Sequence, residues 1–99
     1  METILNVNIR NLIGTNNINK LKNQNKCPAI LYSIENKSVP IELDEKEIFK
    51  LKFMKNIYLK KIFIILNKKK YLVKIKEIQR HVFKNNILHI DFLFIKQIY

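Results

Sequence analysis

Hydrophobic and polar residues alternate along most of this 99-residue chain, a pattern that predicts β-strands with one buried and one solvated face. The alternation is clearest near the end of the chain, where Leu88, Ile90, Phe92 and Phe94 are expected to face the core. The expected strands are Thr3–Arg10, Ala29–Ile34, Val39–Leu43, Ile57–Asn67, Tyr71–Gln79 and Ile87–Ile95.

Side-chain directions follow from the same period of two. In the first strand the inward residues would be Leu5, Val7 and Ile9, with Arg10 outward. In the second, Tyr32 is expected to face outward with its ring free.

One helix is expected from Glu45 to Met54. Asp44 and Glu47 have the spacing of a capping box, in which each side chain accepts a hydrogen bond from a first-turn or N-cap amide. The core-facing residues would be Ile48 and Leu51, with Phe49 left open. Because carboxylates favour a helix N-terminus, the acidic cluster at 42–47 needs no further chemistry.

The spacing of the strands is too even for alternating strand–helix units and predicts a mainly β protein. We expect a small antiparallel β-barrel, or a curled antiparallel sheet, of about six strands with one to three short helices. The residue pair Lys68-Lys69 would turn one long hairpin, although the turn type stays open without a glycine. A single domain would span 1–99, with a basic arm at 15–26 and a short tail at 96–99.

Charge is the strongest compositional signal. Nineteen lysines and arginines against eight acids give a net charge of +11, which attracts a polyanion such as nucleic acid or an acidic membrane. Drift in codon usage accounts for part of the lysine and asparagine content. No apolar run approaches the length of a membrane span and no secretory signal is visible, so we expect a protein of a reducing compartment.

Catalytic and metal-binding classes find little support. One cysteine and two histidines provide neither a disulfide nor a zinc cluster, and no cofactor is expected. There is no Gly-rich phosphate loop and no serine beside a histidine. A ribonuclease that uses His81 and His89 is conceivable but lacks a nucleophile, so we do not expect an enzyme.

His89 and Asp91 share the outward face of the last expected strand, among cations. A carboxylate there would be repelled by phosphate, but it can accept hydrogen bonds from base amino groups. Two simpler interpretations remain: Asp91 forms a salt bridge to Lys74 or Lys76, and His89 is an ordinary surface histidine. Together with Gln79-Arg80, the pair favours RNA recognition through a shallow minor groove.

Four short segments carry a family resemblance: Pro28-Ala-Ile-Leu-Tyr32, Ile41-Glu-Leu-Asp44, Gln79-Arg80-His81 and His89-Ile-Asp91-Phe92. In order and spacing they resemble the short, single-domain form of the bacterial large-subunit ribosomal protein L-twenty-five. The resemblance extends from Arg10 and Gly14 to about Ile95. The chain departs from the family pattern at Ile18, Asn19, Ser33, Lys76 and Val82.

The resemblance implies a β-barrel with helices that binds the loop E region of 5S rRNA through its minor groove. It implies a cytoplasmic ribosomal protein that is monomeric off the ribosome, with no membrane and no small-molecule substrate. Carried over by position, the RNA-binding residues are Arg10, Lys20, Lys22, Tyr32, Lys76, Gln79, Arg80, His89 and Asp91. The alternative is a basic β-domain that docks on an acidic protein or an anionic surface without RNA specificity.

Overall fold

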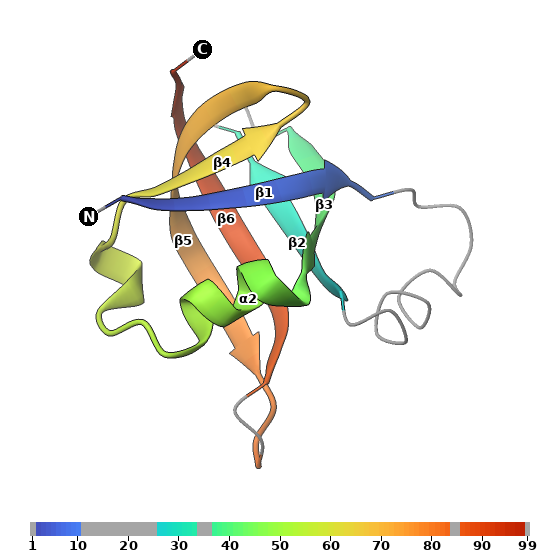
Figure 1. The fold of residues 1–99 in the computed structure, drawn as a ribbon, viewed down its shortest axis with the longest axis vertical. Helices are drawn as coiled ribbons and strands as arrows, with labels where there is room; N and C mark the ends of the chain where they lie inside the picture. The colour runs from blue at the N-terminus through green and yellow to red at the C-terminus, as the bar shows by residue number, and fades with distance from the viewer. Residues whose placement is uncertain (1, 11–25, 34–36, 84–85, 99) are drawn as a thin grey trace.

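The computed structural model describes residues 2–10, 26–33, 37–83 and 86–98, whose backbone closes into a six-stranded β-barrel (Figure 1). Around the barrel the strands follow the order β1-β3-β2-β6-β5-β4, and β4 pairs back with β1. The prediction of a mainly β barrel is therefore confirmed. The strands are β1 (Thr3–Ile9), β2 (Lys26–Tyr32), β3 (Ser38–Asp44), β4 (Ile62–Leu66), β5 (Lys69–Arg80) and β6 (Ile87–Gln97).

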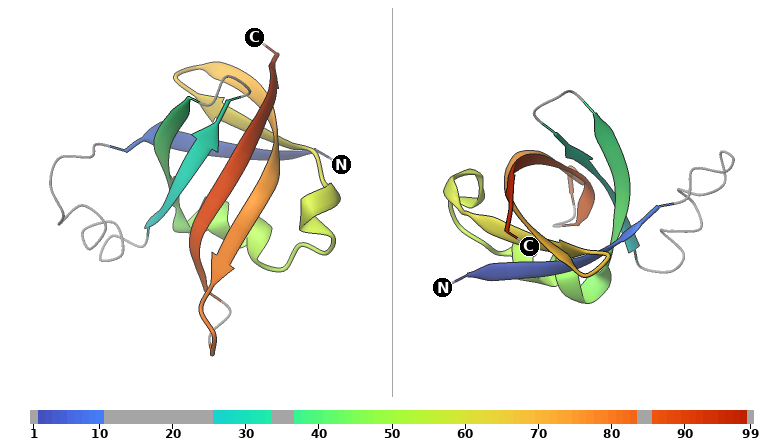
Figure 2. Two further views of the ribbon diagram at one scale, coloured as in Figure 1. Left: turned by 180° about the vertical axis from the view of Figure 1, so that it is seen from behind. Right: turned by 90° about the horizontal axis from the view of Figure 1, so that it is seen from above.

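The barrel is mixed rather than wholly antiparallel. Strand β1 runs parallel to β4, and β2 runs parallel to β6, while the other four pairs are antiparallel. Viewed from above, the strands form a closed ring (Figure 2, right). The alternation of a segment predicts that it is a strand, but it carries no information on which strand lies beside it. Six strands were expected and six are found, but the two parallel pairs contradict the expectation of a wholly antiparallel barrel.

The barrel interior is filled by aliphatic side chains from all six strands and by Phe92. Ile90 and Phe92 are fully buried and Phe94 packs against the core, as expected. Leu88 is 38% exposed, which contradicts its expected inward position. A β-bulge explains the difference: Gln79 pairs with His89 and Arg80 pairs with Ile87, so Leu88 has no partner and Ile87 takes the buried position.

The end of β1 reverses the expected side-chain directions. Leu5 and Val7 are buried as predicted, but Ile9 is 53% exposed and Arg10 only 8% exposed. Ile9 is the last residue of the strand, and Arg10 has already left it while donating its backbone N–H to the Pro40 carbonyl at 3.0 Å. The alternation of side-chain directions therefore ends with the strand and does not predict the direction of Arg10.

Helix α2 (Glu45–Lys52) crosses one end of the barrel (Figure 1). It ends two residues before the expected Met54, and Phe53 occupies its C-cap. Leu51 is fully buried and Ile48 packs against the core, whereas Phe49 is 65% exposed. Phe49, whose burial the sequence left open, therefore does not face the core.

The capping box is absent, because Asp44 makes no side-chain cap and Glu47 points into the protein. Glu47 is 2% exposed and accepts the backbone N–H of Asn6 at 3.4 Å. Lys50 donates its Nζ to both Glu47 carboxylate oxygens, at 2.9 and 3.1 Å, and to the Ile4 carbonyl at 2.8 Å. Glu47 therefore joins the helix to β1 instead of capping it.

The segment before β4 is not strand as expected. Ile57–Leu59 form a 3-10 turn, η1, after Asn56 in the left-handed region (φ 55°), and β4 begins only at Ile62. Buried Ile57 and exposed Leu59 give the segment an apolar content that resembles a strand. Short apolar runs are ambiguous in this way.

The β4–β5 hairpin turns at Asn67-Lys68, one residue before the expected position. Leu66 pairs with Lys69, and both loop residues have positive φ, 51° and 66°, as a type I′ turn requires. At the other end of β5, strand β6 continues to Gln97 and therefore includes part of the expected tail. Residues 15–25 of the expected arm lie outside the described residues, while Lys26 begins β2.

Candidate nucleic-acid interface

Strand β6 lies between β2 and β5, so three strands form one continuous wall (Figure 2, left, teal, red and orange). Register aligns their outward residues in rows across this wall. Asp91 lies between Ile30 and Glu77, and Leu93 lies between Tyr32 and Lys74. We call this surface the β2–β6–β5 face and define it by Tyr32, Lys74, Lys76, Glu77, Gln79, His89 and Asp91.

A second bulge decides which residues of β5 belong to this face. Ile75 pairs with Phe92 and Glu77 pairs with Asp91, so Lys76 is the extra residue. Simple alternation would have placed Lys74 and Lys76 outward and Glu77 inward. The bulge instead brings Glu77 directly opposite Asp91 and places both side chains on the same side of the sheet. Glu77 is a member of the face that sequence reasoning missed.

His89 and Asp91 contact one another along β6. His89 Nδ1 lies 3.3 Å from Asp91 Oδ1, and the two side chains are 26% and 19% exposed. The contact is within ion-pair range but is not aligned as a hydrogen bond, since Oδ1 has no hydrogen-bond partner among the described residues. Asp91 therefore keeps an acceptor oxygen that the protein does not satisfy.

The salt bridge considered for Asp91 does not form. Within the described part of the chain the basic side chain within 4 Å of Asp91 is His89 and not Lys74 or Lys76. Lys76 instead places Nζ 4.7 Å from the centre of the Tyr32 ring, a cation–π contact. The expectation that the Tyr32 ring is free is therefore wrong, because the bulge turns Lys76 toward β2.

Gln79 and Arg80 lie at the end of β5 and are both exposed. Gln79 pairs across the strands with His89, which confirms that the two side chains share one region of the sheet. Arg80 donates Nη1 to the Lys52 carbonyl at 3.4 Å and so connects β5 to the C-terminal end of α2. Its guanidinium is held at the border of the face.

The remaining predicted residues are not gathered on this face. Arg10 is buried, and its Nε has no hydrogen-bond partner among the residues that the structure describes. Lys20 and Lys22 lie outside the described residues. The structure thus brings together Tyr32, Lys76, Gln79, Arg80, His89 and Asp91, and it separates Arg10 from the exposed set by burial.

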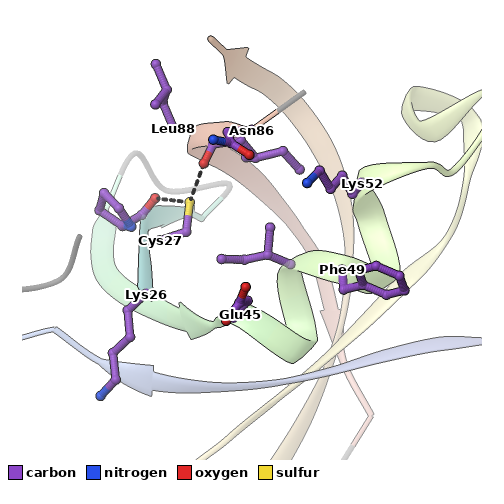
Figure 3. Close-up of a pocket in the computed structure, with 10 residues that line it drawn as sticks. Lys26, Cys27, Glu45, Phe49, Lys52, Asn86 and Leu88 are labelled. Atoms are coloured by element: carbon purple, nitrogen blue, oxygen red, sulfur yellow. Dashed lines mark hydrogen bonds between the residues drawn. The ribbon is translucent and has the colours of Figure 1, made fainter. Parts of the chain in front are cut away.

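A pocket of about 380 Å³ lies between α2 and the ends of β2 and β6 (Figure 3). Cys27 lines one side of the pocket, and Lys52 and Phe49 lie across from it (Figure 3). The Cys27 thiol lies 3.4 Å from the Pro28 carbonyl and 3.7 Å from that of Ile87. Burial raises the pKa of Cys27 to about 12, despite the opposing charge of Arg10. None of the predicted RNA-binding residues lines this pocket.

The described residues also limit other classes of site. Within them there is no group of three or more histidine, cysteine, aspartate or glutamate side chains that could hold a metal ion. No helix in the same residues is long and apolar enough to cross a membrane. The β2–β6–β5 face presents hydrogen-bonding and cationic side chains on paired strands.

Known proteins resemble this chain over most of its length. The model of the Ribosomal L25p family matches residues 5–92. A Large ribosomal subunit protein bL25 of Buchnera aphidicola subsp. Schizaphis graminum is 37% identical over 93 residues, which are 94% of this chain and 97% of that protein. That of Buchnera aphidicola subsp. Baizongia pistaciae is 46% identical over 76 residues, 75% of this chain and 77% of its own.

A third relative is longer. The protein of the same name from Caldicellulosiruptor bescii is 38% identical over 92 residues, which are 93% of this chain but 46% of the relative. The family match over residues 5–92 takes in most of β1, all of β2 to β5, the first part of β6 and every residue that defines the β2–β6–β5 face. The chain belongs to the Ribosomal L25p family: it is a structural component of the large ribosomal subunit, located in the cytoplasm as part of the ribosome, and not an enzyme.

Proposed function

We propose that this ribosomal protein binds the loop E region of 5S rRNA through its minor groove, with the β2–β6–β5 face as the reading surface. A-form RNA displays base edges and 2′-hydroxyls in a wide, shallow minor groove, which a firm sheet can approach. Side chains on paired strands are held more precisely than side chains on loops. The face meets both requirements.

The observation that carries the proposal is the unsatisfied Asp91 Oδ1. Buried polar atoms are nearly always hydrogen-bonded, so an open acceptor calls for a reason. Here it belongs to a carboxylate opposite a second carboxylate, Glu77, within a protein of net charge +11. Two acids in such a place would oppose a purely electrostatic RNA binder, since phosphate repels them. They fit a surface that accepts hydrogen bonds from base amino groups.

His89 has a double role in this proposal. Beside Asp91 it shields the carboxylate in the free protein, and on RNA it turns its ring toward a base or ribose oxygen. That rotation exposes Asp91 Oδ1 to a base donor. Gln79, paired across the strands with His89, adds an amide that can donate and accept at once.

The cations supply affinity rather than sequence reading. Lys76 over the Tyr32 ring and Arg80 at the border of the face are placed for phosphate or ribose contacts. Lys20 and Lys22 remain predicted phosphate contacts of the arm. Arg10 remains a predicted contact as well, but it needs to leave its buried position to reach RNA.

The proposal is tested by Gln79→Ala against Gln97→Ala, because both are exposed glutamines of the same hairpin. Gln79→Ala is expected to weaken binding of a 5S rRNA loop E fragment by about 1–3 kcal/mol while binding of an ordinary duplex stays unchanged. Gln97→Ala should change neither affinity. Equal losses for both RNAs, or no loss from Gln79→Ala, would remove the face from the interface.

A further inference from the structure

A second cationic surface lies away from the β2–β6–β5 face. From Phe53 to Lys76 the chain has no acidic residue. The same stretch contains the lysines Lys55, Lys60, Lys61, Lys68, Lys69, Lys70, Lys74 and Lys76. Codon drift can enrich lysine, but it does not explain why half of all the acids are gathered instead at 42–47. The positive charge is therefore segregated along the chain.

The fold brings part of this charge to one hollow of about 460 Å³. Lys60 and Lys61 come from the segment before β4, and Lys96 comes from the end of β6. Among the residues that the structure describes, no carboxylate lies within ion-pair distance of these three lysines. The acid at the hollow, Glu2, is 63% exposed and lies 3.9 Å from Lys70.

The floor of the hollow is firm and partly apolar. Phe63 pairs with Leu72 across β4 and β5, and Leu72 pairs in turn with Lys96. Leu72 is only 8% exposed, and Lys70 Nζ lies 4.5 Å from the centre of the Phe63 ring. The lysines are thus mounted on paired strands, above apolar side chains that are already largely covered.

The hollow is distinct from the proposed reading surface. Lys96 follows Asp91 by five residues, which is about 17 Å along an extended strand. This is about two Debye lengths at physiological salt, so charges at one surface hardly act on a ligand at the other. The other two lysines adjoin β4, which takes no part in the β2–β6–β5 face.

We infer that Lys60, Lys61 and Lys96 bind the phosphate backbone of a second ribosomal RNA segment, so that the protein bridges two RNA elements of the large subunit. Several ammonium groups without carboxylate partners form the footprint of a phosphate backbone. The inference depends on membership of the ribosome and not on loop E.

RNA fits this surface better than an acidic protein. A protein interface needs an apolar centre from which water is excluded, and aromatic anchors that enter pockets. Here Leu72 is buried and Phe63 is covered by Lys70. The groups at the hollow that lack a partner are the three lysine ammonium groups, and charge alone suffices for phosphate.

A tethered cleavage experiment tests the inference in the assembled particle. Glu2→Cys places a thiol at the hollow without removing any of its lysines, and Lys74→Cys places one on the β2–β6–β5 face. Each thiol carries a chelated iron that generates hydroxyl radicals, and each protein is returned to large subunits stripped of the native protein. Cys27, 2% exposed, is not modified at neutral pH, so the wild-type chain is the background control.

The inference predicts that the Glu2→Cys probe cuts rRNA at nucleotides that the Lys74→Cys probe leaves intact. Cuts confined to the nucleotides reached from Lys74→Cys would mean a single RNA contact and would overturn it. Absence of rRNA cuts, with cleavage of a neighbouring protein or of nothing, would overturn it equally. These outcomes do not depend on whether the Lys74→Cys probe cuts loop E, so the proposed function can fail separately.

A charge variant provides the energetic test. Replacing Lys60, Lys61 and Lys96 together with alanine should leave the affinity for an isolated loop E fragment within twofold. The protein should be released from large subunits at lower salt. The slope of log K for subunit binding against log salt should be lowered by about two to three units. An unchanged slope overturns the inference. A matched control, Lys37→Ala with Lys46→Ala, removes exposed lysines elsewhere.

Discussion

At the scale of the residue, Asp91 distinguishes a reader of RNA from a general polyanion binder. Its side chain is held beside His89 and opposite Glu77, and its Oδ1 has no hydrogen-bond donor within the described residues. Removing a carboxylate from a surface that only attracts phosphate would improve binding. Removing one that accepts a base donor would weaken it.

Asp91→Ala is therefore predicted to weaken binding of a loop E fragment by about 1–3 kcal/mol, measured by calorimetric titration. Glu45→Ala is the matched control, because it removes an exposed carboxylate of α2 that makes none of the proposed RNA contacts. A gain in affinity for Asp91→Ala similar to that for Glu45→Ala would exclude base recognition by Asp91.

The sequence predicted part of which side chains share the β2–β6–β5 face, and it did not predict how they contact one another. The outward placement of His89 and Asp91 followed from alternation and is seen in the structure, whereas Gln79 lies opposite His89 only because of the bulge at Lys76. Two bulges then changed what alternation could show, because one extra residue moves the following side chains to the other face. Glu77 joined the face and Lys76 turned to Tyr32 for this reason.

At the scale of the element, the β4–β5 hairpin contains a correctable strain. Lys68 has a φ of 66°, a left-handed conformation that costs a residue with a Cβ about 1–2 kcal/mol. Asparagine tolerates this region better, which suits Asn67 at the first loop position. The turn therefore has its preferred residue at one position only.

Lys68→Gly is predicted to stabilise the protein by about 0.5–1 kcal/mol, since glycine relieves the strain but gains freedom in the unfolded chain. Urea unfolding monitored by circular dichroism measures it. Lys69→Gly is the control, because it weakens a strand position and should destabilise. Equal effects of the two changes would contradict a type I′ turn at 67–68.

Helix α2 is held to the barrel by Glu47, a residue that the sequence analysis placed in a capping box. Lys50 pairs with the buried Glu47 and also donates to the Ile4 carbonyl of β1. The capping box was expected because Asp44 and Glu47 have its spacing, but spacing along the chain does not reveal that β1 passes beside the helix. Only the closed barrel places the Asn6 amide within reach of Glu47.

Lys50→Met is predicted to lower the free energy of unfolding by about 1–3 kcal/mol, because it leaves a buried carboxylate with one weak donor. Lys46→Met on the exposed side of the same helix should stay within about 0.5 kcal/mol of wild type. Adding Glu47→Met to Lys50→Met should restore part of the loss. A loss that is the same for Lys46→Met and Lys50→Met would argue against the pair.

At the scale of the whole molecule, charge and shape have separate tasks. The net charge of +11 provides long-range attraction for RNA, while the mixed barrel holds β2, β6 and β5 side by side. The barrel class was predictable from even strand spacing and turns. The parallel β1–β4 and β2–β6 pairs were not, because they join strands far apart in sequence.

Lys20→Ala is predicted to weaken binding of every RNA by a similar factor and to lower the salt slope by about one unit. Fluorescence titrations of loop E and of a plain duplex over a salt series measure both quantities. Lys46→Ala, an exposed lysine of α2, is the control for the lost charge. Selective weakening of loop E alone would show that Lys20 reads the RNA instead of neutralising phosphate.

The central claim is that the β2–β6–β5 face recognises one RNA structure, and a competition titration tests it most directly. The protein is titrated with a 5S rRNA loop E fragment and with an A-form duplex of equal length, at low and at near-physiological salt. The account predicts a preference for loop E that persists at the higher salt, because hydrogen bonds to bases are less screened than phosphate contacts. Equal affinities that fall together as salt rises would mean that only charge is used, and would contradict the assignment of Gln79, His89 and Asp91.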